Sequence, residues 1–144
     1  MKILIIAGEV SGDAYAAHLV QSIKMLHPNS IIYAIGGAKL EEHSHHFLFQ
    51  SAYSHGVGIA SKLLKFKFKR RLLTCLSNCL QTTSFDKAII VDFQHVNQPI
   101  AKQLLKYNIP IYTFITPNFW MWKSQKQSKI ICDYSEKIFT IFPQ

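Results

Sequence analysis

The sequence predicts an α/β fold built on a doubly wound parallel sheet. Three observations support this prediction: short apolar runs rich in β-branched residues recur along the chain, segments with helical periodicity separate them, and most runs end at glycine or polar residues. A continuous apolar run is typical of a strand that is buried on both faces, as strands of parallel sheets are. Strands that alternate with helices are typical of repeated βαβ units.

The first βαβ unit begins at residue 2. Its parts are a strand, a glycine-rich turn, a helix and a second strand, at residues 2–7, 8–13, about 13–26 and 30–35. Ser11 or Asp13 is suited to cap the helix, because short polar side chains accept hydrogen bonds from its first free N–H groups. Pro28 and Asn29 end the helix. The crossover is expected to be right-handed, as nearly all such connections are.

The remaining chain continues the alternation. A short helix near residues 38–43 and a short strand near 47–49 precede a long helix over about 61–80; strands at 87–91, 111–115 and 137–142 then alternate with helices at 97–107 and 124–134. The long helix places apolar residues four positions apart, at Leu64, Phe68, Leu72, Leu76 and Leu80. A doubly wound sheet rarely ends on an uncovered strand, so we expect further chain or a partner to supply a missing layer.

The composition excludes several classes of protein. The 144 residues correspond to about one domain, and the 49% hydrophobic and 17% charged residues exclude a disordered tail. No apolar run reaches the roughly 20 residues of a membrane-spanning helix, and the apolar part of the N-terminus is too short for a signal peptide. Three cysteines, an odd number, favour a reducing compartment without a disulfide framework.

Positive charge is concentrated in residues 61–71, called the basic segment below. The formal net charge of the chain is +8, and this segment holds six of the sixteen lysines and arginines and no acid: Lys62, Lys65, Lys67, Lys69, Arg70 and Arg71. Phe66 and Phe68 lie between these cations. The mixture is typical of a helix lying in anionic lipid headgroups, although a solvated face has the same charges. A nucleic-acid interface is a third interpretation, but no helix-turn-helix or RNP motif accompanies the charge.

The carboxyl ends of the predicted strands carry residues suited to a ligand. In open parallel sheets ligands bind outside these ends, which here fall at residues 8–13, 36–37, 92–97 and 116–122. Because the ends of parallel strands meet at one edge, we expect the four segments to line one crevice.

Three of these segments have both a ligand-binding and a structural interpretation. The turn at residues 8–13 precedes a helix N-terminus, which favours phosphate or a sugar, but it lacks GxGxxG and a P-loop lysine, so a tight capped turn is the alternative. Asp92 and His95 could form a general base with its orienting partner, or a turn cap and a surface histidine. Trp120 and Trp122 could stack on a sugar or a base, or pack in the core.

Two groups of potential metal ligands have simpler explanations. His43, His45 and His46 lack the cysteine or carboxylate partners of a zinc site, so an exposed polar loop is expected. Cys75 and Cys79 lie four residues apart on the long helix, and two ligands cannot close a zinc site. They are expected to be small core residues.

Two motifs in order resemble the lipid-A-disaccharide synthase family. Residues 7–13 read AGEVSGD and residues 116–122 read TPNFWMW, where that family typically has AGE-x-SGD and SPS-x-WAW. VGIAS at residues 57–61 is similar to the family's MG-x-x-E before a basic helix, and IFP at 141–143 to its LPFE. The likeness extends over essentially the whole chain.

The resemblance implies a GT-B glycosyltransferase with two Rossmann-like domains. Such an enzyme joins UDP-diacylglucosamine to diacylglucosamine 1-phosphate, releases UDP and forms the lipid A disaccharide, without a metal or bound cofactor. It implies a cytoplasmic enzyme, peripheral on the inner face of the inner membrane. Residues 1–144 would be the acceptor-side domain of a partial or split form, without the C-terminal UDP-binding domain or with that half as a separate chain. The alternative is a non-catalytic Rossmann-like domain that binds lipid or a membrane surface.

The resemblance also implies roles for particular residues. The proposed catalytic pair is Asp92 and His95, where His95 stands in place of the family's second aspartate and could accept a proton near neutral pH. The proposed substrate-binding residues are Gly8, Glu9, Ser11, Gly12, Asp13, Asn97, Pro117, Trp120 and Trp122. The proposed membrane-contact residues are Lys62, Lys65, Phe66, Lys67, Phe68, Lys69, Arg70 and Arg71. Two further departures from the family pattern are Ser61 in place of a glutamate and Asn118 in place of a serine.

Overall fold

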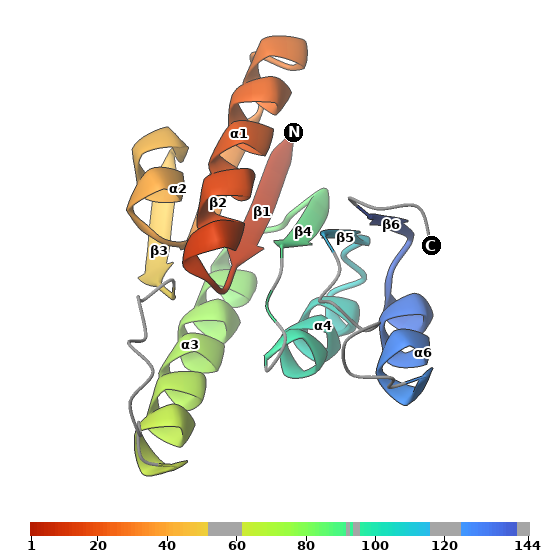
Figure 1. The fold of residues 1–144 in the computed structure, drawn as a ribbon. Coiled ribbons are helices and arrows are strands. Elements are labelled where there is room, and N and C mark those ends of the chain that lie inside the picture. Colours follow the sequence, from red (N-terminus) through yellow and green to blue (C-terminus); the bar gives the residue numbers. More distant parts are fainter. Residues whose placement is uncertain (52–61, 92, 94–95, 116–124, 141–144) are drawn as a thin grey trace.

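The computed structural model describes residues 1–51, 62–91, 93, 96–115 and 125–140. Within this part, six parallel strands form one sheet in the order β3-β2-β1-β4-β5-β6 (Figure 1). The strands are β1 (Lys2–Ala7), β2 (Ile31–Gly36), β3 (His46–Gln50), β4 (Lys87–Val91), β5 (Ile111–Phe114) and β6 (Lys137–Phe139). The helices are α1 (Val10–Leu26), α2 (Ala38–His43), α3 (Lys62–Thr82), α4 (Asn97–Lys106) and α6 (Gln125–Tyr134). The predicted α/β fold with a parallel sheet is confirmed.

Helices cover both faces of the sheet, and alternate side chains of the central strand β1 belong to two hydrophobic cores, one on each face. Leu4 and Ile6 belong to the core shared with α3, α4 and α6, whereas Ile3 and Ile5 belong to the core shared with α1 and α2. All four side chains are fully or almost fully buried. A continuous apolar run is what this central position requires, because both faces of the strand lack contact with water.

Strand β3 is an addition to the five buried strands that the sequence predicts. The short strand expected near residues 47–49 forms as His46–Gln50 and pairs with β2 at one edge of the sheet. At the opposite edge β6 ends at Phe139, three residues before its predicted end. Of those residues, 141 and 142 lie outside the described part. The other boundaries agree with the prediction to within two residues, except at the start of α1.

Helix α1 begins at Val10, three residues before its predicted start. Glu9 is its N-cap residue and makes no side-chain capping hydrogen bond, so the expectation that Ser11 or Asp13 caps this helix is wrong. Both residues lie inside the first turn instead. The Asp13 side chain is free to bond elsewhere, and it does so at the start of α2.

Helix α3 is buried over only part of its length. Leu72, Leu76 and Leu80 are buried in the core, but Leu64 is 59% exposed, which corrects the prediction that the buried stripe begins there. The N-terminal end of α3 extends beyond the sheet, so its apolar positions have no strand to cover (Figure 1). Within the described ranges, none of the helices combines the length and apolarity needed to span a bilayer.

The three clustered histidines do not form an isolated loop. His43 ends α2 and its ring nitrogen lies 2.9 Å from Gln21 Nε2, while His46 begins β3 and stacks on Tyr33. His45 Nδ1 accepts a hydrogen bond of 3.0 Å from the backbone N–H of Ile32. Burial and, secondarily, the positive charge of Lys24 lower the pKa of His45. The three rings therefore have separate partners, and no group of three potential metal ligands occurs among the residues described.

Cys75 and Cys79 are half-buried on α3, and Cys79 packs against the core as expected of a small core residue. The Cys75 thiol donates a hydrogen bond to the carbonyl of Leu48. Burial raises the pKa of both thiols, which makes them poor nucleophiles at neutral pH. The third cysteine, Cys132, is exposed, and all three thiols are free.

Candidate functional site

The candidate site lies at the carboxyl ends of β1 and β4. The chain leaves β1 toward β2 on one side and later enters β4 on the other, so the strand order reverses between these two strands. Such a switch point opens a crevice outside the carboxyl ends of a parallel sheet. The two segments that leave the sheet here are residues 8–13 after β1 and residues 92–97 after β4.

Gly8 and Phe93 pack against each other across this switch point. A Cβ atom on Gly8 would overlap the Phe93 ring. Phe93 is buried and belongs to the core on the α3 side of the sheet. A glycine is therefore required after β1, because any side chain there would displace the segment that follows β4.

Asp13 connects α1 to the start of α2. Its Oδ1 accepts hydrogen bonds from the backbone N–H groups of Gly37 at 2.6 Å and Leu40 at 3.1 Å, and Oδ2 accepts one from Lys39 at 3.1 Å. The side chain is 4% exposed. These donors are unpaired N–H groups at the N-terminus of α2, where a negative charge is favourable. Asp13 therefore holds the segment after β2 against the segment after β1.

Ser51 makes a second connection at the same edge. Its hydroxyl donates a hydrogen bond of 2.5 Å to the carbonyl of Ala7, the last residue of β1. Its backbone N–H donates to the carbonyl of Gly36, the last residue of β2. One fully buried residue thus fixes the carboxyl ends of β1, β2 and β3 relative to one another.

Asn97 lies in a small group of buried polar side chains beside the switch point. It is the first residue of α4 and is buried, and its side chain lies near the Tyr134 hydroxyl. Neither Asn97 Oδ1 nor the Tyr134 hydroxyl has a hydrogen-bond partner among the residues described. Burial raises the pKa of Tyr134 to about 12, so its hydroxyl stays protonated at neutral pH. Asn97 Oδ1 and the Tyr134 hydroxyl oxygen can both still accept a hydrogen bond.

Backbone strain occurs where β5 leads toward residues 116–122. Ile115 has a φ angle of 62°, in the left-handed region that a β-branched residue rarely adopts. Its N–H donates a hydrogen bond of 2.8 Å to the carbonyl of Phe139, and its side chain is buried. Such a conformation costs roughly 1–3 kcal/mol and persists only where the surrounding structure enforces it. The chain therefore turns sharply at the carboxyl end of β5.

The structure brings part of the predicted site together. Gly8 and Glu9 connect β1 to α1, and Ser11, Gly12 and Asp13 lie in the first turn of α1 at the switch point, with the side chains of Glu9 and Ser11 exposed. Asn97 begins the helix that follows β4. The other predicted residues, Asp92, His95, Pro117, Trp120 and Trp122, lie outside the described residues.

The basic segment and this crevice lie at the same end of the sheet, beyond the carboxyl ends of the strands (Figure 1). Helix α3 begins on the side toward which the carboxyl ends of the strands point (Figure 1). Five of the predicted membrane-contact residues are exposed, namely Lys65, Phe66, Lys67, Arg70 and Arg71, and Lys69 is half-buried. Phe68 is half-buried and packs edge-on against Phe49, so it belongs partly to the core. The side chain of Lys62 lies outside the described part.

Sequence reasoning missed Ser51, Phe93 and Tyr134. Ser51 follows β3, and this strand was not expected to belong to the main sheet. Phe93 lies among the polar residues on which the predicted chemistry of this segment depends. Tyr134 reaches the site from α6, at a distance in the sequence that no local pattern reveals. A serine two residues after the apolar run at residues 47–49 is the one available signal among the three.

The motifs at these strand ends agree with the comparison to known proteins. The family model for lipid-A-disaccharide synthetase matches residues 3–144. The chain belongs to this family. Lipid-A-disaccharide synthase of Coxiella burnetii is 30% identical over 147 residues, which cover 96% of this chain and 39% of the relative. Lipid-A-disaccharide synthase 1 of Legionella pneumophila is 32% identical over 143 residues, which cover 99% and 37%. The chain thus spans well under half the length of these curated relatives.

Solved structures share the fold. MurG of Acinetobacter baumannii matches with a TM-score of 0.65 and 11% identity, over 99% of this chain and 42% of that chain. An FMN-dependent UbiX-like decarboxylase of Escherichia coli O157:H7 matches with a TM-score of 0.63 and 9% identity, over 100% and 81%. Because proteins as different as these two share the architecture, the fold alone does not decide the reaction.

The Asp13 connection predicts a large loss of stability in Asp13→Ala. The substitution leaves three backbone N–H groups without their acceptor, two of them buried, which should lower the free energy of unfolding by about 3 kcal/mol or more. Alanine favours a helix more than aspartate does, so α1 itself would gain. Urea unfolding measures the difference. Asp133→Ala, at an exposed aspartate of α6, is the matched control and should change stability by less than about 0.5 kcal/mol. Equal losses in the two variants would contradict the assigned role of Asp13.

Proposed function

We propose that the chain is the acceptor-side domain of a lipid-A-disaccharide synthase. The observation that carries the proposal is the family match over residues 3–144, together with the turn at residues 8–13 at the switch point of the sheet. In the proposed reaction, a hydroxyl oxygen of diacylglucosamine 1-phosphate bonds to the anomeric carbon of UDP-diacylglucosamine. The bond from that carbon to the UDP oxygen breaks, UDP leaves, and the hydroxyl proton passes to a base.

The described residues are suited to hold an acceptor sugar at this edge. Glu9 and Ser11 offer exposed oxygen atoms at the start of α1, where Asp13 and Ser51 hold the backbone in place. A rigid turn limits the movement of a bound hydroxyl, which is how positioning contributes to rate. We further propose Asp92 and His95 as the groups that flank the acceptor hydroxyl, with His95 as the base, and Pro117, Trp120 and Trp122 as the opposing wall.

The test combines the chain with the part of the Coxiella burnetii relative that follows the matched residues. The proposal predicts release of UDP from UDP-diacylglucosamine only when both polypeptides and diacylglucosamine 1-phosphate are present. His95→Ala should lower the rate by about 10²–10⁴-fold, the usual contribution of a general base. His18→Ala, an exposed histidine on α1, is the control and should leave the rate unchanged.

Two results would count against these assignments. Failure of the combined polypeptides to release UDP would contradict the synthase proposal. Release of UDP at the same rate with His95→Ala would remove the proposed base while leaving the proposed activity in place.

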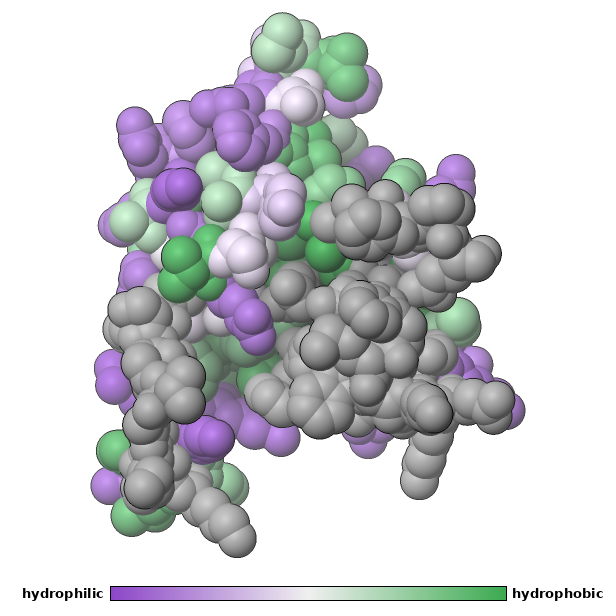
Figure 2. Space-filling model, in the orientation of Figure 1, coloured by the Kyte–Doolittle hydropathy of each residue, from purple (hydrophilic) through white to green (hydrophobic). Residues whose placement is uncertain are grey.

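A membrane-surface role is supported by a separate observation on α3. Leu63, Leu64 and Phe66 are each about 60% exposed. Hydrophobic and hydrophilic side chains adjoin at this end of the molecule, at the lower left of Figure 2. Apolar side chains among cations are suited to the boundary between acyl chains and anionic headgroups. We propose that α3 contacts such a surface, either within the synthase or in a domain that binds lipid without catalysis.

The membrane proposal predicts binding to phosphatidylglycerol vesicles in a flotation assay. Leu63→Ser combined with Phe66→Ser should weaken binding at least about tenfold, because burial of each side chain contributes on the order of 1.5–3 kcal/mol. Added salt should weaken the binding further. The control is Met25→Ser with Leu26→Ser, which removes two apolar side chains at the far end of α1 that are still more exposed than Leu63 and Phe66. Equal binding by the two double variants would contradict a contact through α3.

A further inference from the structure

Strand β3 lies at an edge of the sheet and is packed less closely than the strands beside it. None of its residues is fully buried. Its pairing with β2 is also irregular, because the register shifts between Ala34 and Ile35. Parts of a fold with few buried contacts open at a lower free energy than the core does. The individual hydrogen bonds that attach β3 to β2 therefore decide how firmly this edge is closed.

Hydrogen bonds from side chains attach residues 37–51, called the edge segment below, at its start, its middle and its end. The Asp13 carboxylate holds the start, where α2 begins. Ser51 holds the end, because it bonds to the last residues of β1 and β2. Between them, His45 bonds to Ile32 near the start of β2. The middle attachment is the only one of these three that uses an imidazole ring.

His45 satisfies both backbone groups that Ile32 directs toward the edge segment. The backbone N–H of His45 donates a hydrogen bond of 2.9 Å to the Ile32 carbonyl, and the ring Nδ1 accepts one of 3.0 Å from the Ile32 N–H. The imidazole thus takes the place that a strand carbonyl has in a regular ladder. Ile32 is fully buried, so an N–H group left here without its acceptor would be costly.

The bond to Ile32 exists only while the imidazole is neutral. Nδ1 accepts a hydrogen bond when the ring proton is on Nε2, whereas a second proton makes both ring nitrogens donors. The Nδ1–H of a protonated His45 would face the Ile32 N–H, and the bond would be lost. Histidine is the side chain that ordinarily changes charge in mild acid, and His45 is exposed, so protons from solvent reach it.

The surroundings of His45 oppose its protonation. Burial, followed by the positive charges of Lys24 on α1 and His46 on β3, lowers the pKa of His45 below its ordinary value of 6.5. Strand β2 contributes the neutral ring of Tyr33, which stacks on His46. On α2 the carboxylates of Glu41 and Glu42 are exposed, and neither offsets these positive charges at His45. Because the pKa is lower in the folded state, the stability from this bond is fully present above pH 6.5 and is lost as the pH falls.

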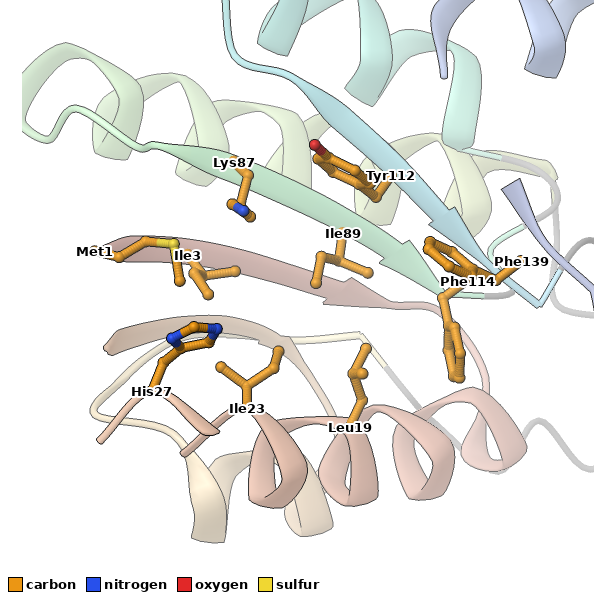
Figure 3. A pocket seen from close by; sticks show the side chains of 10 residues that line it. All are labelled: Met1, Ile3, Leu19, Ile23, His27, Lys87, Ile89, Tyr112, Phe114 and Phe139. Carbon is orange, nitrogen blue, oxygen red and sulfur yellow. The ribbon is translucent and has the colours of Figure 1, made fainter. Parts of the chain in front are cut away.

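Two neighbouring histidines lack this sensitivity. His43 Nε2 lies 2.9 Å from Gln21 Nε2, and a glutamine can turn its amide to offer oxygen to a protonated ring. The backbone N–H of Ile32 has no such alternative. His27, at the end of α1, points into a pocket lined by residues of α1, β1, β4 and β5 (Figure 3), away from the pairing of β2 with β3. His45 is therefore the ring whose protonation opposes the sheet directly.

We propose that protonation of His45 in mild acid releases the edge segment from β2, so that this edge of the sheet is a pH-sensitive element. The segment ends at Ser51, whose bonds fix the carboxyl ends of β1 and β2. Acid would therefore loosen the candidate site as well. The proposal depends neither on sugar transfer nor on membrane contact, so it can stand or fall without either of them.

The test measures hydrogen-exchange protection factors by NMR at about pH 7.5 and about pH 5, on either side of the ordinary histidine pKa. The reporters are the amides of Ile32 and Ser51, and the references are the amides of Ile5 and Ile90 in the central strands. Acid should lower protection at the reporters by between about fivefold and about thirtyfold. Thirtyfold is the limit for one group with an ordinary pKa in the open state. The references should change by less than about twofold, because exchange from the central strands requires more extensive opening.

His45→Asn separates the titration from the bond itself. Asparagine offers an amide oxygen near the position of Nδ1 and does not titrate, so protection at Ile32 should be the same at both pH values. His27→Asn is the matched control at an exposed histidine, and it should lose protection in acid as the unmodified chain does. In the unmodified chain, the loss at Ile32 should follow the titration of the His45 ring, which the same NMR experiments record.

Four results would overturn the proposal. They are equal protection of the unmodified chain at both pH values, an acid loss in His45→Asn as large as in the unmodified chain, an equal loss in the reference strands, and a loss whose midpoint differs from that of the His45 ring. The third result would assign the acid sensitivity to unfolding of the whole sheet rather than to its edge.

Discussion

The close approach of Gly8 to Phe93 is the constraint on which the rest of the site depends. Strand β1 lies between β2 and β4, and its carboxyl end leaves no room for a side chain beside the segment that follows β4. This contact sets the separation of the two segments that border the switch point. Parallel pairing alone would bring strand ends to one edge, but it would not fix the loops beyond them. Because residue 8 is a glycine, the segment after β1 can pack directly against Phe93, and this contact fixes its position at the edge of the sheet.

Asp13 and Ser51 extend this order across the other strands. Asp13 joins the turn after β1 to the start of α2, and Ser51 joins the ends of β1 and β2. Both groups are buried, so an unpaired partner would be costly, and the bonds therefore specify one arrangement of the edge. The polar residues of the first motif thus divide into two sets. Asp13 is buried and holds the start of α2 by hydrogen bonds, whereas Glu9 and Ser11 are exposed at the same edge of the sheet.

The sequence predicted the sheet better than it predicted the site. Apolar runs identify β1 and β4 because burial on both faces leaves a local pattern. Asp13 was assigned to the wrong helix because capping of α2 from α1 is a contact across 24 residues, which no local spacing reveals. Leu64 fits the helical period of α3, yet the period cannot tell where the core beneath the helix ends. The parts of the predicted site at Asp92, His95 and residues 116–122 stay predictions.

A double-mutant cycle at Gly8 and Phe93 tests the central constraint most directly. Gly8→Ala should destabilise the chain by about 1–3 kcal/mol, because the added methyl group overlaps the ring. In a Phe93→Ala background the methyl group has space, so the same substitution should cost at least about 1 kcal/mol less in urea unfolding. Effects that add to within about 0.5 kcal/mol would show that the two residues are independent and would contradict the account.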